Sequence, residues 1–255
     1  MTKPVASGGV LAPALDCPRP QPDSAMRLVC FPHSGAGPEL YRSWADALGP
    51  EIEVHTITLP GRGRRWREPF TVAWEPLLDE FAEAIGDRVR PPFSLFGHSL
   101  GALFAYEIAH RLTSAEHLFV SARASPARTP RIAIPADDAE LLELVDQLYD
   151  GVPGQIKDNP ELARHFMPAL RADMELGAHY THRPDRIVRT PITALGGLDD
   201  ATVDATDLAA WRPYTTAAFT WRQFPGGHFY PRQSETAVLR VIRRRLVPRT
   251  TGRIR

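Results

Sequence analysis

The chain has 255 residues, and its 30 Lys and Arg residues balance its 30 Asp and Glu residues. This balance removes the usual electrostatic reason for binding nucleic acid or an anionic membrane, so we expect neither as a partner. Cys17 and Cys30 are its only cysteines. They form neither a disulfide framework nor a metal-ligand cluster, so we expect a reducing, cytoplasmic location and no metal site.

The two ends of the chain lack the periodicity of folded elements. Residues 1–25 are rich in Pro, Gly and Ala, without the basic start and apolar run of a signal peptide. No window of about 18 apolar residues occurs in the sequence. We expect residues 1–25 to be a disordered leader, 248–255 a disordered basic tail, and 26–247 a single, monomeric domain.

Between these ends, short β-branched or aromatic runs alternate with segments of helical period. The expected strands are RLVCF, IEVHTITL, FSLFG, HLFVSA, PITALG and FTWRQF. The main helical segments are PELYRSWADAL, AWEPLLDEFAEAIGDRV, LGALFAYEIAHRL and SETAVLRVIRRRL. Such alternation predicts an α/β fold with a mostly parallel central sheet flanked by helices.

The segment from about residue 124 to 189 interrupts this alternation. SPARTPRIAIP is too rich in proline for a helix, but DDAELLELVDQLY and NPELARHFMPALRADMELGAHY both have helical period. Pro168 is expected to kink or divide the second helix. Because the sheet already has its own helices, the two inserted helices predict a lid. The alternative is that they only extend the core.

Ser99 lies in GHSLG, a GxSxG pattern that is a weak signal alone because it also arises by chance. Here it follows an apolar strand and opens a helix, which is the context of a nucleophile elbow. Gly97 and Gly101 allow the strand and helix to approach closely, while Ser99 takes the strained apex. A serine hydroxyl is a poor nucleophile at neutral pH, so the motif requires a general base and a group that orients it.

His228 in FPGGHFY is the expected base, because it follows the last strand on a glycine-containing loop and precedes the final helix. Upstream, the strand PITALG runs into GLDDATV, which places two aspartates at a strand's carboxyl end. We prefer Asp200 to Asp199, since GxxDxxV is the usual spacing of the acid loop. Ordinary turn and loop roles are the alternatives for the serine and the histidine.

A tetrahedral oxyanion also requires two backbone N–H donors. Leu100, the residue after the nucleophile, is expected to supply one. The loop LVCFPHSGAG follows an early strand, and Ser34 is the candidate for the second through its backbone N–H. The alternative for this loop is a phosphate-binding role, but it lacks the Lys and the spacing of a P-loop.

Five blocks in order resemble the type II thioesterases, the freestanding editing enzymes of modular polyketide and nonribosomal peptide synthesis. They are CFPHSGAG, LPGRGRR, LFGHSLGALFAYEIA, LGGLDDATV and FPGGHFY. The resemblance runs from about Arg27 to the final helix and implies an α/β-hydrolase fold with a mobile helical lid. The family's triad falls on Ser99, Asp200 and His228, and its oxyanion amides on Ser34 and Leu100. SGAG departs from the family's commoner PHAGG or PYAGG, and the leader is longer than usual.

The resemblance further implies a substrate, namely an acyl group held as a thioester on the phosphopantetheine arm of an acyl or peptidyl carrier protein. Removal of stalled or wrong acyl groups through an acyl-serine would need no metal or cofactor. The apolar stripe of the insertion suggests that Leu144, Leu148 and Phe166 narrow the pocket. Another hypothesis is that an acidic carrier or the arm's phosphate docks on the arginines of LPGRGRR, which are Arg62, Arg64 and Arg65. The alternative is that this segment is a solvated loop.

Two rival functions remain open from the sequence. A general carboxylesterase or lipase of the same fold would share the triad and differ in substrate. A noncatalytic hydrolase-like binding protein would keep the core and lose a triad member, whereas this chain retains all three residue types.

Overall fold

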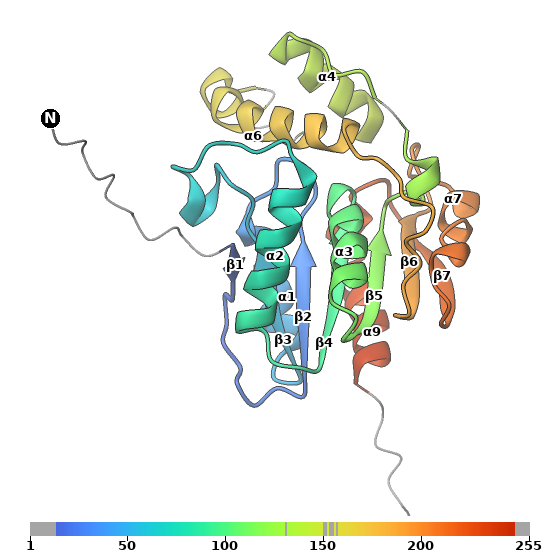
Figure 1. Ribbon diagram of the computed structural model, residues 1–255. Helices are drawn as coiled ribbons and strands as arrows, with labels where there is room; N and C mark the ends of the chain where they lie inside the picture. Colours follow the sequence, from blue (N-terminus) through green and yellow to red (C-terminus); the bar gives the residue numbers. More distant parts are fainter. Residues whose placement is uncertain (1–13, 131, 150–151, 153–155, 157, 248–255) are drawn as a thin grey trace, which may run out of the picture.

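The computed structural model describes residues 14–130, 132–149, 152, 156 and 158–247 (Figure 1). Its sheet has seven strands in the order β1-β3-β2-β4-β5-β6-β7, all parallel except for β1. The strands are β1 (Leu15–Asp16), β2 (Met26–Phe31), β3 (Ile52–Ile57), β4 (Phe93–His98), β5 (Ala115–Ser121), β6 (Ile192–Gly197) and β7 (Phe219–Phe224). The predicted mostly parallel α/β sheet is confirmed.

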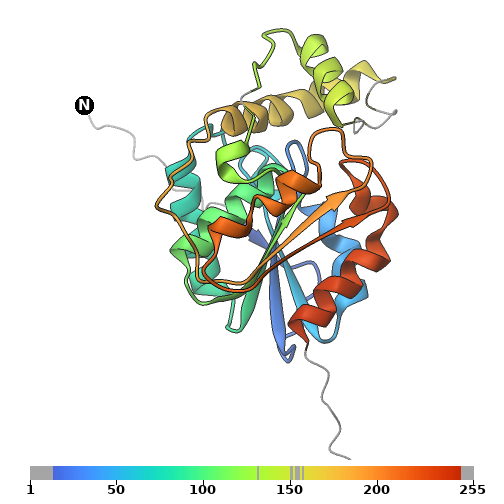
Figure 2. The same ribbon diagram turned by 90° about the vertical axis from the view of Figure 1, so that its right-hand side faces the viewer.

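Helices cover both faces of this sheet. They are α1 (Arg42–Leu48), α2 (Trp74–Arg88), α3 (Leu100–Arg111), α4 (Asp138–Tyr149), α6 (Pro160–Ala178), α7 (Ala205–Ala209), α8 (Tyr230–Gln233) and α9 (Glu235–Leu246). Helices α2, α3 and α7 pack on one face, and α1 and α9 on the other (Figure 2). Within β2, Val29 belongs to the first core and Leu28 to the second, which is the alternation of a strand buried on both faces.

The strand order places the candidate residues at a crevice. The chain runs from β2 outward to β3 and then returns to β4 on the other side of β2. In open α/β sheets, the loops leaving such a pair of strands separate at their carboxyl ends and make room for a ligand. Ser34 follows β2 and Ser99 follows β4, so the two residues flank this switch point.

The prediction that residues 1–25 form a disordered leader is wrong for residues 14–25. Leu15 pairs with Ile57 as β1 joins the sheet edge antiparallel to β3, and Thr58 N donates to Ala14 O at 2.7 Å. Ala14 and Leu15 are buried in the core, and this burial offsets the entropy lost on ordering the segment. Residues 1–13 and the predicted tail 248–255 lie outside the described residues.

The insertion forms a two-helix layer above the carboxyl ends of the strands, as both views show (Figures 1 and 2). α4 and α6 share a small apolar core of their own, which includes Leu141, Val145, Leu170 and Met174. Asn159 caps α6 by accepting hydrogen bonds from two backbone N–H groups. α6 is one helix across Pro168, so of the two predicted effects of this proline, dividing the helix is wrong.

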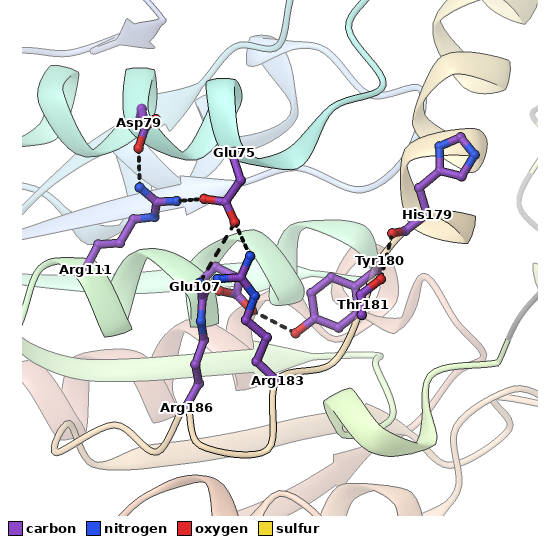
Figure 3. Close-up of polar contacts among 9 residues, drawn as sticks. All are labelled: Glu75, Asp79, Glu107, Arg111, His179, Tyr180, Thr181, Arg183 and Arg186. Atoms are coloured by element: carbon purple, nitrogen blue, oxygen red, sulfur yellow. Dashed lines mark hydrogen bonds and ion pairs between the residues drawn. The ribbon is translucent and has the colours of Figure 1, made fainter.

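The chain that leaves α6 is fastened to helices α2 and α3 (Figure 3). Tyr180 donates from its hydroxyl to Glu107 of α3 at 2.9 Å, and Arg186 forms an ion pair with the same carboxylate. Arg183 donates to Glu75 of α2 at 2.7 Å. These contacts fix one end of the two-helix layer to the core. No helix in the described part of the chain is long and apolar enough to cross a membrane.

Candidate active site

Ser99 occupies a strained turn between β4 and α3. Its φ of 54° and ψ of −118° lie where non-glycine residues are rarely found. The turn is so tight that it requires glycines on both sides of Ser99. A Cβ on Gly97 would lie 2.0 Å from Gly101 O, and a Cβ on Gly101 would lie 2.1 Å from Phe31 O. Ser99 N donates to Ser121 O at 2.8 Å, which anchors the apex to the neighbouring strand. The structure therefore has the elbow that GHSLG predicts.

Three distant segments converge on this turn. His228 Nε2 lies 3.0 Å from Ser99 Oγ, and His228 Nδ1 lies 2.9 Å from Asp200 Oδ2. Because a carboxylate only accepts hydrogen bonds, Nδ1 carries the proton and Nε2 is left to accept the serine O–H. The three side chains are buried and form one hydrogen-bonded chain. This is the geometry in which an imidazole can remove a proton from a serine hydroxyl.

Asp200 is held in its charged form by its neighbours. Burial opposes ionisation, but hydrogen bonds from His228 and from Thr202 outweigh it and lower the pKa of Asp200. Thr202 donates to Asp200 Oδ1 from its backbone N–H at 2.9 Å and from its hydroxyl at 2.7 Å. The other oxygen of Asp200, Oδ2, is thus left to accept the hydrogen bond from the imidazole of His228.

Asp199 makes different contacts from Asp200 and does not bond to His228. Asp199 N donates to Gly226 O at 3.0 Å, and Gly226 N donates to Asp199 Oδ2 at 3.3 Å. Gly226 adopts a φ of +113°, which only glycine takes readily. A Cβ on Gly197 would lie 2.3 Å from Gly226 O, so the acid loop and the histidine loop touch at glycines. Asp199 therefore joins the two loops, and the preference for Asp200 as the partner of His228 agrees with the geometry.

Both predicted oxyanion residues lie beside the nucleophile. Ser34 and Leu100 line one cavity together with Ser99 and His228. Next to Ser34, Gly35 has a φ of +76° and its N–H donates to Asp173 Oδ2 of α6 at 2.7 Å. The amide of Gly35 is therefore occupied, whereas the preceding residue faces the cavity.

The carrier-docking prediction for Arg62 is wrong. Arg62 is 8% exposed and grips the buried carboxylate of Asp173 with two hydrogen bonds of 2.6 and 2.8 Å. It also donates to Ala36 O at 3.3 Å. Arg62 and Asp173 thus join α6 to the loop that carries Ser34, and this contact was not visible in the sequence because its partners are 111 residues apart.

The docking prediction is also wrong for Arg65. This residue is 3% exposed, pairs with Glu68 and Glu80 at 2.6 Å each, and donates to Thr58 O at 2.9 Å. A short 3-10 turn (Gly63–Arg65) directs the first and last arginines of RGRR inward and leaves Arg64 exposed. Of the three arginines predicted to dock a carrier, Arg64 is thus the one that is exposed.

The lid residues that line the cavity differ from those expected. Leu144, Leu148 and Phe166 do not line it; the apolar side chains that do are Ile132, Val145, Leu170 and Met174. Helix α4 is rotated so that Leu141 and Val145 are its buried positions. Phe166 instead packs near Gly35, where an added Cβ would lie 2.8 Å from its ring. An apolar stripe marks one face of a helix, but not which residues on it reach a cavity.

Sequence reasoning also missed Tyr149 and Arg123, two further cavity residues with polar groups. The ring of Tyr149, at the end of α4, lies 4.4 Å from the ring of His228, so the lid contacts the candidate base directly. Arg123, shortly after β5, lines the same cavity. Neither belongs to a recognisable motif, although each follows or ends a predicted element.

One group among the described residues has metal-ligand spacing. The ligand atoms of Cys17, Glu53 and His55 lie within 4.8 Å of one another, at the sheet edge formed by β1 and β3. Hydrogen bonds already engage both oxygens of Glu53, one with His55 at 2.7 Å and the other with Gln21 N at 2.5 Å. Burial raises the pKa of the Cys17 thiol to about 11, which disfavours the thiolate that a metal needs. These contacts explain the cluster as a hydrogen-bonded edge of the sheet.

The chain is similar to known proteins in both sequence and fold. The family model for the thioesterase domain matches residues 26–246. Thioesterase PikA5 of Streptomyces venezuelae is 34% identical over 222 residues, which cover 83% of this chain and 77% of the relative.

Solved structures agree with this match. The type II thioesterase BorB, from the borrelidin biosynthetic cluster, has a TM-score of 0.82 and 35% identity, covering 91% of this chain and 97% of BorB. RedJ, a thioesterase from the prodiginine pathway of Streptomyces coelicolor, has a TM-score of 0.83 and 34% identity, covering 93% and 96%. The chain therefore belongs to the thioesterase family, and its fold is the α/β-hydrolase fold.

Proposed function

We propose that this protein hydrolyses thioesters that join acyl groups to the phosphopantetheine arms of carrier proteins, and so removes stalled or aberrant acyl groups during polyketide or nonribosomal peptide synthesis. The observation that carries the proposal is the hydrogen-bonded chain from Ser99 through His228 to Asp200 beneath a helical lid. BorB, from the borrelidin biosynthetic cluster, and RedJ, from the prodiginine pathway, support the substrate class.

The first half of the reaction follows from the protonation states. His228 Nε2 accepts the hydroxyl proton as Ser99 Oγ bonds to the thioester carbonyl carbon, and the Asp200 carboxylate stabilises the imidazolium that forms. The backbone N–H groups of Ser34 and Leu100 are proposed to hold the oxyanion. When the carbon–sulfur bond breaks, the imidazolium protonates the departing thiolate, leaving an acyl-serine.

The second half repeats the same proton transfers with water. His228 takes a proton from water as its oxygen attacks the acyl-serine, and returns that proton to Ser99 Oγ as the free acid leaves. His228 carries each proton between Ser99 Oγ, the departing thiolate and water, so the proposed reaction uses no metal or cofactor. Ser99, His228 and Asp200 complete the triad without a residue from a second subunit. We propose a monomer that acts on carrier proteins in the cytoplasm.

The direct test is loss of an acyl group from a carrier protein. We would load a holo-carrier domain with a butyryl group and follow its mass with the wild-type protein and with Ser99→Ala. We expect the butyryl mass to disappear only with the wild type. Unchanged butyryl-carrier in both reactions would overturn the proposal.

The same preparation separates the rival functions. Rapid hydrolysis of p-nitrophenyl esters with no turnover of the carrier thioester would indicate a general carboxylesterase. Failure of a serine-directed fluorophosphonate to label Ser99 would indicate a noncatalytic protein.

A further inference from the structure

Arg123 is held firmly at the edge of the active-site cavity. The chain turns after β5 at Ala122, whose φ is 49°, and Ala122 N donates to Leu195 O at 2.8 Å. Trp211 donates from its indole N–H to Arg123 O at 2.8 Å. The backbone of Arg123 is therefore anchored on both sides, and its side chain lines the cavity that contains Ser99.

The guanidinium of Arg123 has no counter-ion in the described part of the chain. Its Nε is shielded from solvent and lacks a hydrogen-bond partner there. Burial lowers the pKa of this guanidinium, but an arginine in a protein remains charged. The residue as a whole is half-buried, but a charged group with a shielded, unpaired nitrogen is costly, so its presence needs an explanation.

The carboxylates nearest to the cavity are already engaged. Asp173, which lines it, is gripped by Arg62 and by Gly35 N–H. Asp200 accepts from His228 and Thr202. The phenols of Tyr149 and Tyr180 interact with Arg123, but they are neutral and do not compensate its charge. Among the residues that the structure describes, the positive charge of Arg123 in this cavity is therefore unmatched.

Apart from Tyr149 and Asp173, the side chains that the lid contributes to the cavity are apolar. Ile132, Val145, Leu170 and Met174 line it together with Arg123. Ligand pockets commonly combine apolar walls with a few fixed polar groups that set the ligand's orientation. A planar guanidinium matches the two oxygens of a carboxylate, which gives a strong and directional pair.

We propose that Arg123 binds a carboxylate at the far end of the acyl group, so that this protein favours acyl groups derived from dicarboxylic acids over uncharged acyl groups of equal length. The inference rests on the proposed function and adds a substrate class to it. Arg123 is a specificity-determining residue in this account and takes no part in the proton transfers.

The phosphate of the pantetheine arm is the other anion that such a substrate carries. It lies at the end of the arm away from the thioester, whereas Arg123 shares a lidded cavity with Ser99. This placement favours the acyl carboxylate. Thioesters of pantetheine, which lack the phosphate, isolate the acyl group and separate the two sources.

The test compares succinyl-pantetheine with butyryl-pantetheine, two four-carbon acyl groups that differ by a terminal carboxylate. For the wild type, we expect a higher kcat/KM on the succinyl substrate. Arg123→Met should lower the succinyl-to-butyryl ratio by about 10- to 100-fold, the effect of losing a charged hydrogen-bonded pair. Arg123→Lys should restore part of the ratio. Arg128→Met is the matched control, because Arg128 is exposed and pairs with Asp207 at 3.3 Å outside the cavity.

Binding provides a readout that does not depend on folding of an Arg123 variant. With Ser99→Ala, titration calorimetry should show succinyl-pantetheine binding at least ~10-fold more tightly than butyryl-pantetheine, with the difference shrinking as salt rises. Equal binding of both substrates would overturn the inference.

The kinetic outcomes are also decisive. Equal losses on the two substrates in Arg123→Met would assign Arg123 a structural role and overturn the inference. A loss that appears only with phosphopantetheine thioesters would assign it to the arm phosphate, which also overturns the inference. Turnover of butyryl-pantetheine by the wild type reports on the proposed function separately, because it does not require the carboxylate.

Discussion

The floor and the roof of the active-site cavity are built in different ways. The floor consists of residues just past the carboxyl ends of strands, and backbone hydrogen bonds and glycine contacts fix the turns that carry Ser99 and His228. The roof consists of apolar side chains from α4 and α6, which share a small core of their own. Reaction chemistry therefore depends on backbone geometry, whereas the room for an acyl chain depends on which side chains the two helices present.

Floor and roof meet at a few specific contacts. Asp173 of α6 binds Gly35 N–H and Arg62, and Tyr149 of α4 lies against the ring of His228. Beyond the cavity, the contacts of Glu75 and Glu107 hold the chain that follows α6 (Figure 3). A movement of α6 would thus disturb the loop that carries Ser34. Substitutions in the floor, at the joints and in the roof should consequently have different effects.

The largest effect should come from the floor. Ser99→Ala removes the nucleophile, and we expect kcat on butyryl-pantetheine to fall by about 10⁴-fold or more. The melting temperature should change little, because alanine fits the space of serine. Steady-state kinetics with thermal unfolding as control makes this check, and substantial residual turnover would assign the chemistry to another group.

The acid loop allows a matched pair of substitutions. Asp200→Asn places an amide opposite His228 Nδ1 and favours the wrong tautomer, so we expect kcat to fall by about 10⁴-fold. Asp199→Asn keeps an acceptor for Gly226 N–H and should cost less than about 10-fold, since Asp199 does not contact the imidazole. If the two variants had similar rates, Asp200 would not be the partner of the base.

The joint between roof and floor should give an intermediate effect. Arg62→Met leaves the buried carboxylate of Asp173 uncompensated beside the loop that carries Ser34. We expect kcat to fall by about 10- to 100-fold, with a smaller change in KM for a small thioester.

Two further variants sharpen this expectation. Adding Asp173→Asn to Arg62→Met should recover part of the rate, because it removes the bare charge. Arg64→Met, in the same motif but exposed, is the matched control. Equal losses in Arg62→Met and Arg64→Met would show that the joint does not position the oxyanion loop.

A substitution in the roof should alter chain-length preference and leave the chemistry intact. Val145→Phe enlarges a side chain that lines the cavity, so the ratio of decanoyl- to acetyl-pantetheine turnover should fall by about 10-fold. Leu144→Phe, at the preceding position of the same helix, should leave this ratio nearly unchanged. A similar shift in both variants would mean that α4 does not present Val145 selectively to the acyl chain.

The smallest effect concerns the acid stability of the sheet that carries the floor. Burial lowers the pKa of His117 to about 4 and that of His98 well below its usual range. Between about pH 6.5 and pH 4 the unfolded chain binds protons that the folded chain does not, so stability falls by up to roughly 1.4 kcal/mol per pH unit for each histidine. Urea unfolding at pH 7.5 and 5 measures this, and His117→Gln should reduce the slope. An unchanged slope would contradict the assignment for His117.

The sequence was most informative where function and local structure coincide. GHSLG, GLDDATV and FPGGHFY combine a strand end, glycines at close approaches and a reactive side chain, so each motif located its residue without tertiary information. The alternation of strands and helices likewise predicted the sheet. In contrast, β1 was missed because its two residues gain their stability from pairing with Ile57 and Thr56.

Side chains whose roles depend on distant partners were predicted poorly. Arg62 looked like an exposed docking residue because its partner Asp173 lies far along the chain. Leu144 and Val145 are both apolar, and only the rotation of α4 decides which one reaches the cavity. Arg123 belongs to no motif that the sequence analysis recognised. Only the structure shows that this arginine lacks a counter-ion among the described residues.

The most direct measurement is to trap the covalent intermediate. Wild-type protein mixed with butyryl-carrier, quenched in acid within milliseconds and digested, should yield a butyryl adduct on the peptide containing Ser99. Asp200→Asn should form that adduct more slowly, and Ser99→Ala should form none. A butyryl adduct on a different residue, or full turnover by Ser99→Ala, would contradict the account.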